Sequence, residues 1–214
     1  MEQKENVVIT VSRQLGSGGS YVGQEVAKKL GFFYADRSII REAAKKLSVK
    51  EETVAEREES VPSLWRAFLS SACIYPDLYV PPVMLLPTGH DFFLAESDVI
   101  KRVADERCAV IIGRCGFHIL RDHPGRISVF IHADRAYRIE RYRSIYKTTE
   151  EEAAKTVTRC DKERANYFRN YTGCDMTDAQ NYNLAIDTSQ LPHLDDAVAL
   201  ILRYVELRRG GCAT

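Results

Sequence analysis

Short runs of consecutive apolar residues alternate along the chain with longer stretches in which apolar residues recur at helical spacing. A continuous apolar run is typical of a strand that is covered on both faces of a sheet. Five runs have this character: Val7–Val11, Phe32–Ala35, Cys108–Gly113, Arg126–Ile131 and Leu184–Ile186. The alternation predicts a doubly wound α/β fold, in which ligands bind beyond the carboxyl ends of the strands.

Helices are expected in the intervals between these runs. Helical spacing is found after the first glycine cluster up to Leu30, at 39–47, 91–107, 133–146, from 149 to at least 164, and at 194–209. Thr149 and Glu152 form a capping-box pattern, and Gly31 is placed to end the first helix. The segment 73–87 differs, because its four prolines exclude a helix while its apolar residues are too many for a free loop. It is expected to be an insert or a subunit contact.

Composition adds limits to this picture. The 214 residues, 45% of them hydrophobic, suit one compact domain. The 30 basic and 30 acidic side chains cancel, so there is no electrostatic reason to expect nucleic acid or a membrane surface as a partner. No apolar run approaches the roughly 20 residues that span a bilayer, and a cytoplasmic location is expected. The six cysteines include no CxxC pair, which favours reduced thiols over structural zinc.

The segment Val7–Leu30 is expected to form a strand, a glycine-rich turn and a helix. At such a junction several backbone N–H groups and the positive end of the helix dipole point to one place, which makes it a natural phosphate site. The dinucleotide pattern GxGxxG fits Gly16 and Gly18 but requires a glycine at Tyr21. That pattern is therefore incomplete.

The mononucleotide pattern GxxxxGK[ST] is the competing interpretation of the same turn. It fits Gly18 and Ser20, but Arg13 stands in place of its first glycine and Gly19 in place of its lysine. A glycine-rich turn without any ligand is a third interpretation. The turn alone does not choose among the three.

Polar residues gather directly after the predicted strands. Arg13 follows the first strand, Asp36 and Arg37 the second, Arg114 the third, and Asp134 and Arg135 the fourth. The planar arginine fork binds phosphate oxygens in pairs, so arginine at several strand ends is what a site for two phosphorylated molecules needs. Arginine is also common on protein surfaces, so these arginines could be surface residues without a ligand. Arg114 fits this interpretation least, because it follows a buried strand and a glycine.

Several runs together resemble the cytidylate kinase-like family, relatives of bacterial cytidylate kinase among the nucleoside monophosphate kinases. In order, they are ITVSRQLGSGG, GFFYADRSII, IIGRCGFHILRD and CDKERANYFRNYTG followed by NYNLAIDTS, with about 50–95 poorly matched. The resemblance implies a P-loop NTPase fold, a three-layer sandwich whose five-stranded parallel sheet has the order 2-3-1-4-5. It also implies a helical acceptor-binding insert at 37–95 and a mobile lid at 147–173.

The resemblance implies roles for individual residues as well. Gly16, Ser17, Gly18, Gly19 and Ser20 would wrap the phosphates of ATP, and Ser20 would also reach Mg²⁺. Asp36, Arg41 and Arg114 would meet the acceptor. Arg159, Asp161 and Arg164 match the lid segment, in which the two arginines would cover the transferring phosphoryl group and Asp161 would lie beside the substrate.

The implied activity is ATP- and Mg²⁺-dependent phosphoryl transfer to a small nucleotide, with CMP or dCMP as the best single choice. Bacterial cytidylate kinases have lysine at the position of Gly19 and aspartate at that of Cys115, which leaves nucleotide affinity and base choice open. Arg13 is the candidate to supply the missing cation, with Gly19 leaving room for it. A nucleotide-binding regulatory protein without catalysis and a small-molecule kinase with another acceptor are the alternatives.

Overall fold

The computed structural model of the chain describes residues 6–40, 42–44 and 90–210. Its centre is a parallel sheet of five strands in the order β2-β3-β1-β4-β5. The strands are β1 (Val8–Arg13), β2 (Phe33–Ala35), β3 (Ala109–Ile112), β4 (Arg126–His132) and β5 (Leu184–Asp187). All five predicted strands and their order are confirmed, and each boundary lies within two residues of the prediction.

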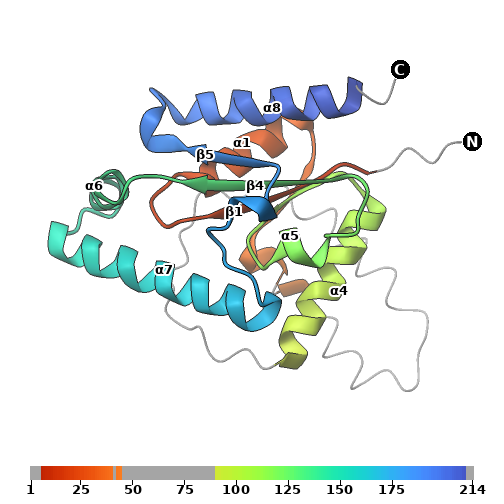
Figure 1. The fold of residues 1–214 in the computed structure, drawn as a ribbon, viewed down its shortest axis with the longest axis horizontal. Coiled ribbons are helices and arrows are strands. Elements are labelled where there is room, and N and C mark those ends of the chain that lie inside the picture. The colour runs from red at the N-terminus through yellow and green to blue at the C-terminus, as the bar shows by residue number, and fades with distance from the viewer. Residues whose placement is uncertain (1–5, 41, 45–89, 211–214) are drawn as a thin grey trace, which may run out of the picture.

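Helices cover both faces of the sheet, which makes a three-layer sandwich (Figure 1). On one face lie α1 (Gly19–Leu30) and α8 (Leu194–Gly210), which pack against each other. On the other lie α4 (His90–Glu106), α5 (Gly116–Ile119) and α7 (Glu150–Thr172). Helix α6 (Arg135–Tyr146) follows β4 at the carboxyl end of the sheet, and two 3₁₀ turns, η1 (Ala179–Asn181) and η2 (Thr188–Gln190), flank β5. The sequence prediction missed α5, because four residues are too few to show a helical period.

The first helix begins directly after the glycine-rich turn and packs on the sheet through its apolar face. Val22 and Val26 have no exposed surface and lie in a core cluster with residues of β1, β3 and β4. Gly31 ends the helix in the left-handed conformation, as predicted. The burial of Val22 and Val26 fixes the direction of α1, so the positive end of its dipole faces the turn.

Helix α7 is anchored along its length. Thr149 and Glu152 form the predicted capping box at its start. Val157 packs with Leu15 in one buried cluster, and Phe168 stacks on Phe117 of α5, with ring centroids 4.6 Å apart, in another. The helix therefore connects the glycine-rich turn at one end to an aromatic cluster under the sheet at the other.

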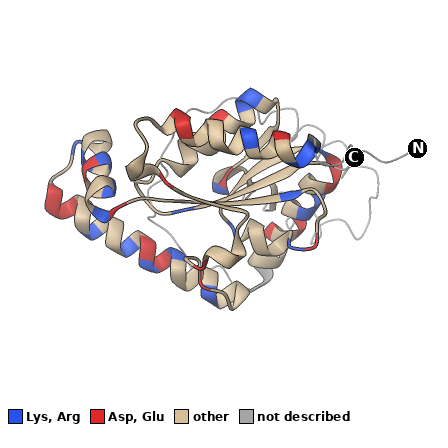
Figure 2. Cartoon of the chain, turned by 45° about the horizontal axis from the view of Figure 1, so that its top comes forward, with Lys and Arg blue, Asp and Glu red and all other residues tan. Residues whose placement is uncertain are grey.

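Basic and acidic residues are both spread over the described helices (Figure 2). None of the helices that the structure describes is both long and apolar enough to cross a membrane. Arg41, the segment 73–87 and most of the predicted insert 37–95 lie outside the described residues. The four described cysteines, Cys108, Cys115, Cys160 and Cys174, are free thiols, as predicted.

Candidate functional site

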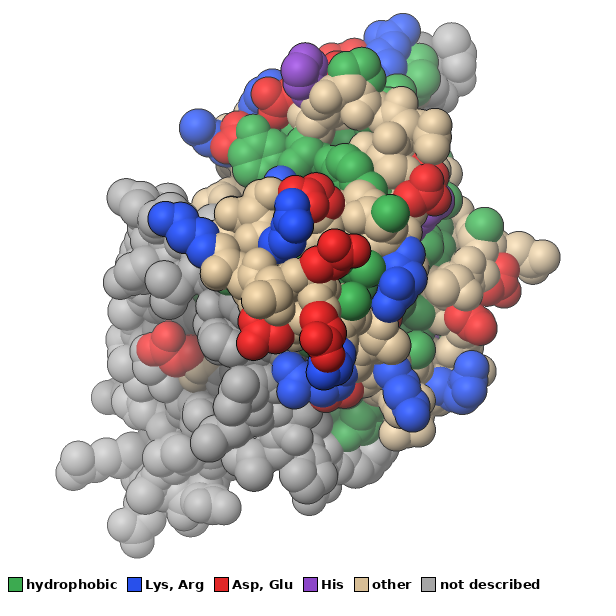
Figure 3. All heavy atoms as spheres, turned by 90° about the vertical axis from the view of Figure 1, so that its left-hand side faces the viewer, with side chains coloured by type: hydrophobic (Ala, Val, Ile, Leu, Met, Phe, Trp, Pro, Cys, Tyr) green, Lys and Arg blue, Asp and Glu red, His purple; other side chains and the backbone are tan. Residues whose placement is uncertain are grey.

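The glycine-rich turn lies at the carboxyl edge of the sheet, on the side of the molecule that faces the viewer in Figure 3. Gly16 and Gly18 have φ of +83° and +81°, which side chains rarely adopt. In the described part of the chain, the N–H groups of Gly18, Gly19 and Ser20 donate to no protein acceptor. The turn thus presents a row of open donors at the start of a helix, the arrangement that binds phosphate.

Hydrogen bonds to the neighbouring strands hold the turn in this shape. The Ser17 hydroxyl donates to the carbonyl of Ile131 at 3.1 Å and to that of Gln14 at 2.9 Å. The carbonyl of Ser17 accepts from the Thr188 hydroxyl at 2.8 Å. Ser17 and Thr188 are buried, so the shape of the turn is set before any ligand arrives. The Ser17 side chain serves this scaffold, and its predicted contact with ATP would be through the backbone.

Arg13 is the last residue of β1, where it pairs with Ile131, rather than the first residue after the strand. Its stem passes over the start of α1, since a Cβ at Gly19 would lie only 2.6 Å from the Arg13 Cβ. Its guanidinium reaches the end of β3, where a Cβ at Gly113 would collide with Nη1. The side chain therefore crosses from the phosphate turn to the neighbouring strand end.

The charge of Arg13 is poorly compensated. Burial lowers the pKa of its guanidinium, and the positive charge of Arg164 lowers it further. Asp36 lies near enough to oppose this effect, but no salt bridge joins Arg13 to a carboxylate in the described ranges, and its Nε has no hydrogen-bond partner. A half-buried cation of this kind is a natural partner for an anionic ligand.

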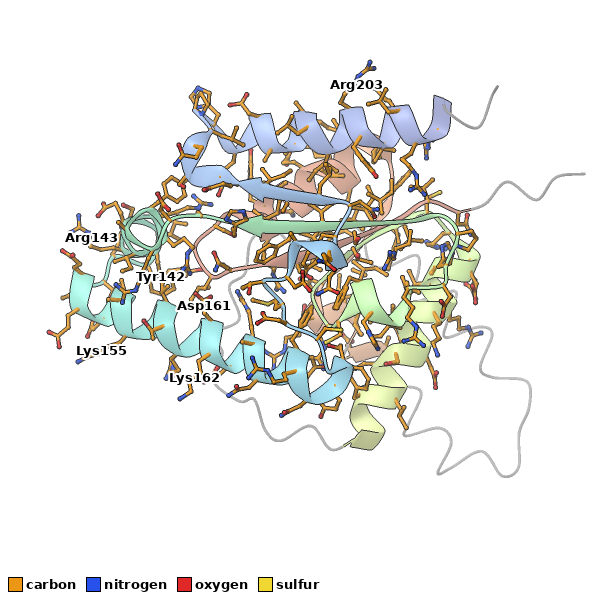
Figure 4. All side chains as sticks on the ribbon, in the orientation of Figure 1. Tyr142, Arg143, Lys155, Asp161, Lys162 and Arg203 are labelled. Atoms are coloured by element: carbon orange, nitrogen blue, oxygen red, sulfur yellow. The ribbon has the colours of Figure 1, made fainter. Side chains whose placement is uncertain are left out.

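Asp161 and Arg164 of α7 both contact the region of the turn. Asp161 accepts from the Leu15 N–H at 3.1 Å and forms a salt bridge at 2.5 Å with Arg138, whose side chain is 7% exposed. Arg164 donates to the Arg13 carbonyl at 3.2 Å. Figure 4 shows Asp161 on the side of α7 that faces the sheet, whereas Lys162 projects from the opposite side.

These contacts bear on two predictions about α7. Asp161 has two protein partners, and its contact with substrate stays a prediction. Movement of 147–173 as a lid also stays a prediction, and it would require α7 to separate from Leu15 and from Phe117. Arg159, the third residue matched to the lid, is exposed on the same helix.

Asp36 directly follows β2 and caps the helical residues 37–40. Its Oδ1 accepts from the N–H and the hydroxyl of Ser38, at 2.9 and 2.7 Å, and from the N–H of Ile39 at 3.0 Å. The cap accounts for one carboxylate oxygen without any ligand. A contact between Asp36 and an acceptor would use the other oxygen.

Arg114 follows β3, as predicted, but its side chain turns inward. It forms a salt bridge with Glu96 of α4, and the two side chains are 5% and 1% exposed. The guanidinium carbon lies 4.6 Å from the ring centre of Tyr167 in α7. The charge of Arg114 is therefore matched by a buried carboxylate and covered by an aromatic ring, and its predicted hold on an acceptor phosphate stays a prediction.

The residue after Arg114 is also interior. Cys115 has no exposed surface and lies in the aromatic cluster with Phe117 and Phe168. Burial raises the pKa of its thiol to about 12. An uncharged thiol in an apolar cluster cannot accept hydrogen bonds as a carboxylate does, so this position supports packing in the present chain.

The described residues offer only a limited site for a metal ion and a larger one for phosphates. No group of three or more His, Cys, Asp or Glu side chains among the described residues could hold a metal ion. Mg²⁺ that accompanies a nucleotide needs only one or two protein ligands in addition to phosphates and water. Ser20, half-buried in the first turn of α1, fits that limited role. The open N–H groups and Arg13 fit the phosphates.

Sequence reasoning missed three residues of this region. Arg138 lies in a helix crowded with charged residues, a pattern typical of a solvated face, but it is 6% exposed and donates to the carbonyl of Leu15 at 3.3 Å. Glu96 reads as a polar position of an amphipathic helix, and Thr188 as a loop residue. Their partners lie far away along the chain, and no local pattern could have revealed them.

Comparison with known proteins identifies the family of this chain. The model of the cytidylate kinase-like family matches residues 8–190. The chain belongs to this family. The match spans the sheet, the glycine-rich turn, α7 and the strand ends that carry Arg13, Asp36 and Arg114.

Among curated proteins, the cytidylate kinase of Thermoplasma volcanium is 23% identical over 209 residues, which cover 94% of this chain and 93% of that protein. The cytidylate kinase of Methanosarcina acetivorans is 34% identical over 83 residues, 38% of this chain and 46% of that protein. Both relatives carry the name of one enzyme, at an identity too low to transfer its acceptor.

Solved structures support the fold of this cytidylate kinase-like protein. An uncharacterized protein from Eubacterium ventriosum is similar with a TM-score of 0.71 and 22% identity, over 94% of this chain and 99% of that one. A gluconokinase from Sinorhizobium meliloti has a TM-score of 0.51 and 15% identity, over 98% and 99%. A shikimate kinase from Bacteroides thetaiotaomicron has a TM-score of 0.50 and 15% identity, over 94% and 99%. The fold is that of P-loop kinases.

Proposed function

We propose that this protein transfers the γ-phosphoryl group of ATP to a pyrimidine nucleoside monophosphate, with CMP or dCMP as the first choice. The observation that carries the proposal is the turn at Gly16–Ser20, whose open N–H groups face the same region as the uncompensated guanidinium of Arg13. Family membership and the names of the two curated relatives support the choice of acceptor.

The reaction asks the protein for positioning and positive charge. An acceptor phosphate oxygen forms a bond to the γ-phosphorus while the bond from that phosphorus to the β-phosphate oxygen breaks, and ADP leaves. Mg²⁺ bound with the nucleotide would neutralise part of the phosphate charge. In the protein, the N–H groups of Gly18 and Gly19 would hold the donor phosphates, and Arg13 and Arg164 would lie beside the group in transfer.

A phosphate acceptor also fits the carboxylates of the site. A hydroxyl acceptor loses a proton during transfer and needs a base, whereas a phosphate oxygen does not. Of the carboxylates beside Arg13 and the turn, Asp161 is engaged with Arg138 and Leu15, and Asp36 caps a helix through one oxygen. Among the described residues, Asp161 is therefore not available as a base and Asp36 has only one oxygen left, which is compatible with an acceptor that needs no base.

The first test is ADP release by the purified protein with ATP, Mg²⁺ and one acceptor at a time: CMP, dCMP, UMP or AMP. Turnover is expected with CMP or dCMP. The turnover rate with AMP should be at least tenfold lower. ATP binding without turnover on any acceptor would contradict the proposal and support a regulatory protein. Turnover only with a non-nucleotide acceptor would support a small-molecule kinase, a candidate favoured by the burial of Arg114 and Cys115.

Arg114→Ala tests the acceptor side of the same proposal. If the guanidinium also serves the acceptor, the KM for CMP should rise about tenfold or more, since a charge-assisted hydrogen bond contributes about 1.5 to 3 kcal/mol. The affinity for ATP, measured by calorimetry, should change less than threefold. Equal loss of both, or loss of stability with an unchanged KM, would assign Arg114 to the scaffold alone.

A further inference from the structure

Two departures from the mononucleotide pattern lie in contact in the folded protein. The pattern GxxxxGK[ST] has a glycine at position 13 and a lysine at position 19, whereas this chain has Arg13 and Gly19. A Cβ at Gly19 would lie 2.6 Å from Cβ and 3.1 Å from Cγ of Arg13. The stem of the arginine therefore occupies the space from which a lysine side chain at position 19 would start.

Gly113 completes the path of this side chain. Nη1 of Arg13 lies against the Cα of Gly113 so closely that any Cβ there would collide with it. Gly113 also has a φ of +73°, which adds a second reason for glycine. With glycine at both contacts, the guanidinium extends from the turn to the end of β3, which lies between β1 and β2.

Two of the three neighbouring arginines already form salt bridges with carboxylates. Arg114 is neutralised by Glu96, and Arg138 by Asp161. Arg164 donates to the carbonyl of Arg13 and lies close enough to lower its pKa. Among the described residues, Arg13 forms no salt bridge with a carboxylate, and its buried Nε has no hydrogen-bond partner.

We infer that the glycine and the cation of the phosphate loop have exchanged places in this chain, so that Arg13 contacts the β- and γ-phosphates of ATP from position 13. The inference rests on the proposed function for its effect on turnover, but not for its effect on binding. Since the guanidinium reaches from the donor turn to the β3 end, Arg13 also faces the side on which the acceptor would bind. It is then a catalytic residue that touches the phosphates of the donor.

The test uses the full chain and a reciprocal exchange. Arg13→Ala should lower ATP affinity tenfold or more and lower turnover by about 100- to 1,000-fold, the range for loss of one charge-stabilising donor. Affinity for AMP, which lacks the β- and γ-phosphates, should stay within threefold. Arg13→Lys keeps the charge without the fork and should retain an intermediate activity.

Gly19→Lys alone should lower activity, because the new side chain collides with the stem of Arg13. The double replacement Arg13→Gly with Gly19→Lys restores the complete pattern GxxxxGKS. Its activity should be at least tenfold higher than that of Arg13→Gly alone. The matched control is Arg143→Ala, an exposed arginine of α6 paired with Glu140 at 2.9 Å, which should change neither ATP affinity nor turnover.

Two results would overturn the inference: unchanged ATP affinity in Arg13→Ala, or tighter ATP binding in Gly19→Lys alone. Circular dichroism of each variant separates loss of folding from loss of binding, and the recovery in the double variant tests the exchange even if Arg13→Ala is unstable. If the wild-type protein turns over no acceptor, the proposed function fails, while the ATP and AMP affinities still decide the role of Arg13.

Discussion

Glu96→Ala is expected to lower the free energy of unfolding by about 3 to 5 kcal/mol, the cost of breaking a buried ion pair by removing one partner. The partner left behind is Arg114, whose side chain is 5% exposed and covered by the ring of Tyr167. The guanidinium therefore has little contact with water. Urea denaturation followed by circular dichroism measures the loss.

The controls for Glu96 separate charge from shape. Glu96→Gln keeps the size and one acceptor oxygen and should cost less than Glu96→Ala. Arg102→Ala breaks an exposed ion pair with Glu106 on the same helix. Exposed ion pairs contribute at most about 1 kcal/mol to stability, so this variant should lose no more than that. If Glu96→Ala lowered the free energy of unfolding by less than about 1 kcal/mol, Arg114 would have access to water or to another partner. Its guanidinium could then also bind an acceptor phosphate.

Asp161→Ala is expected to destabilise the protein by about 3 kcal/mol, the lower end of the same range because Asp161 is 22% exposed. The replacement leaves Arg138 without its carboxylate and the Leu15 N–H without its acceptor. It also removes the polar connection between α7 and the phosphate turn. Hydrogen exchange of residues 150–172 should therefore become faster in the variant, which mass spectrometry can follow.

Two other variants show whether the loss of stability comes from the contacts of Asp161. Asp161→Asn retains an oxygen for the Leu15 N–H and should recover part of the stability. Lys162→Ala, on the opposite side of α7 in Figure 4, should change stability by less than about 0.5 kcal/mol. If Asp161→Ala proved as stable as the wild type but lost acceptor binding, Asp161 would belong to the substrate site rather than to the scaffold.

The fold was predictable from the sequence because its signals are local and agree with one another. Continuous apolar runs such as Val8–Ile9 and Val110–Ile112 became strands with almost no exposed surface. The Thr149 capping box and the Gly31 end signal depend on residues within one helical turn, and both are confirmed. The resemblance supplied the strand order, which local patterns alone cannot give.

The site was predictable only where its residues follow a strand directly. Arg13, Asp36 and Arg114 are at the strand ends, as expected. The direction of each side chain was not predictable, because it depends on partners distant in sequence: Glu96 draws Arg114 inward, and Gly19 with Gly113 lets Arg13 cross the strand ends. Charge pairing over such separations leaves no periodic pattern in the sequence.

The position of β1 in the middle of the sheet has a consequence for folding. Val8 pairs with Ala109 on one side and with Arg126 on the other, so both neighbours of the first strand are made long after it. During synthesis β1 stays unpaired until β3 has been made, and its second edge stays open until β4 has left the ribosome. Contacts so far apart in sequence slow folding and expose strand edges to aggregation. Refolding yield should therefore fall steeply with rising protein concentration.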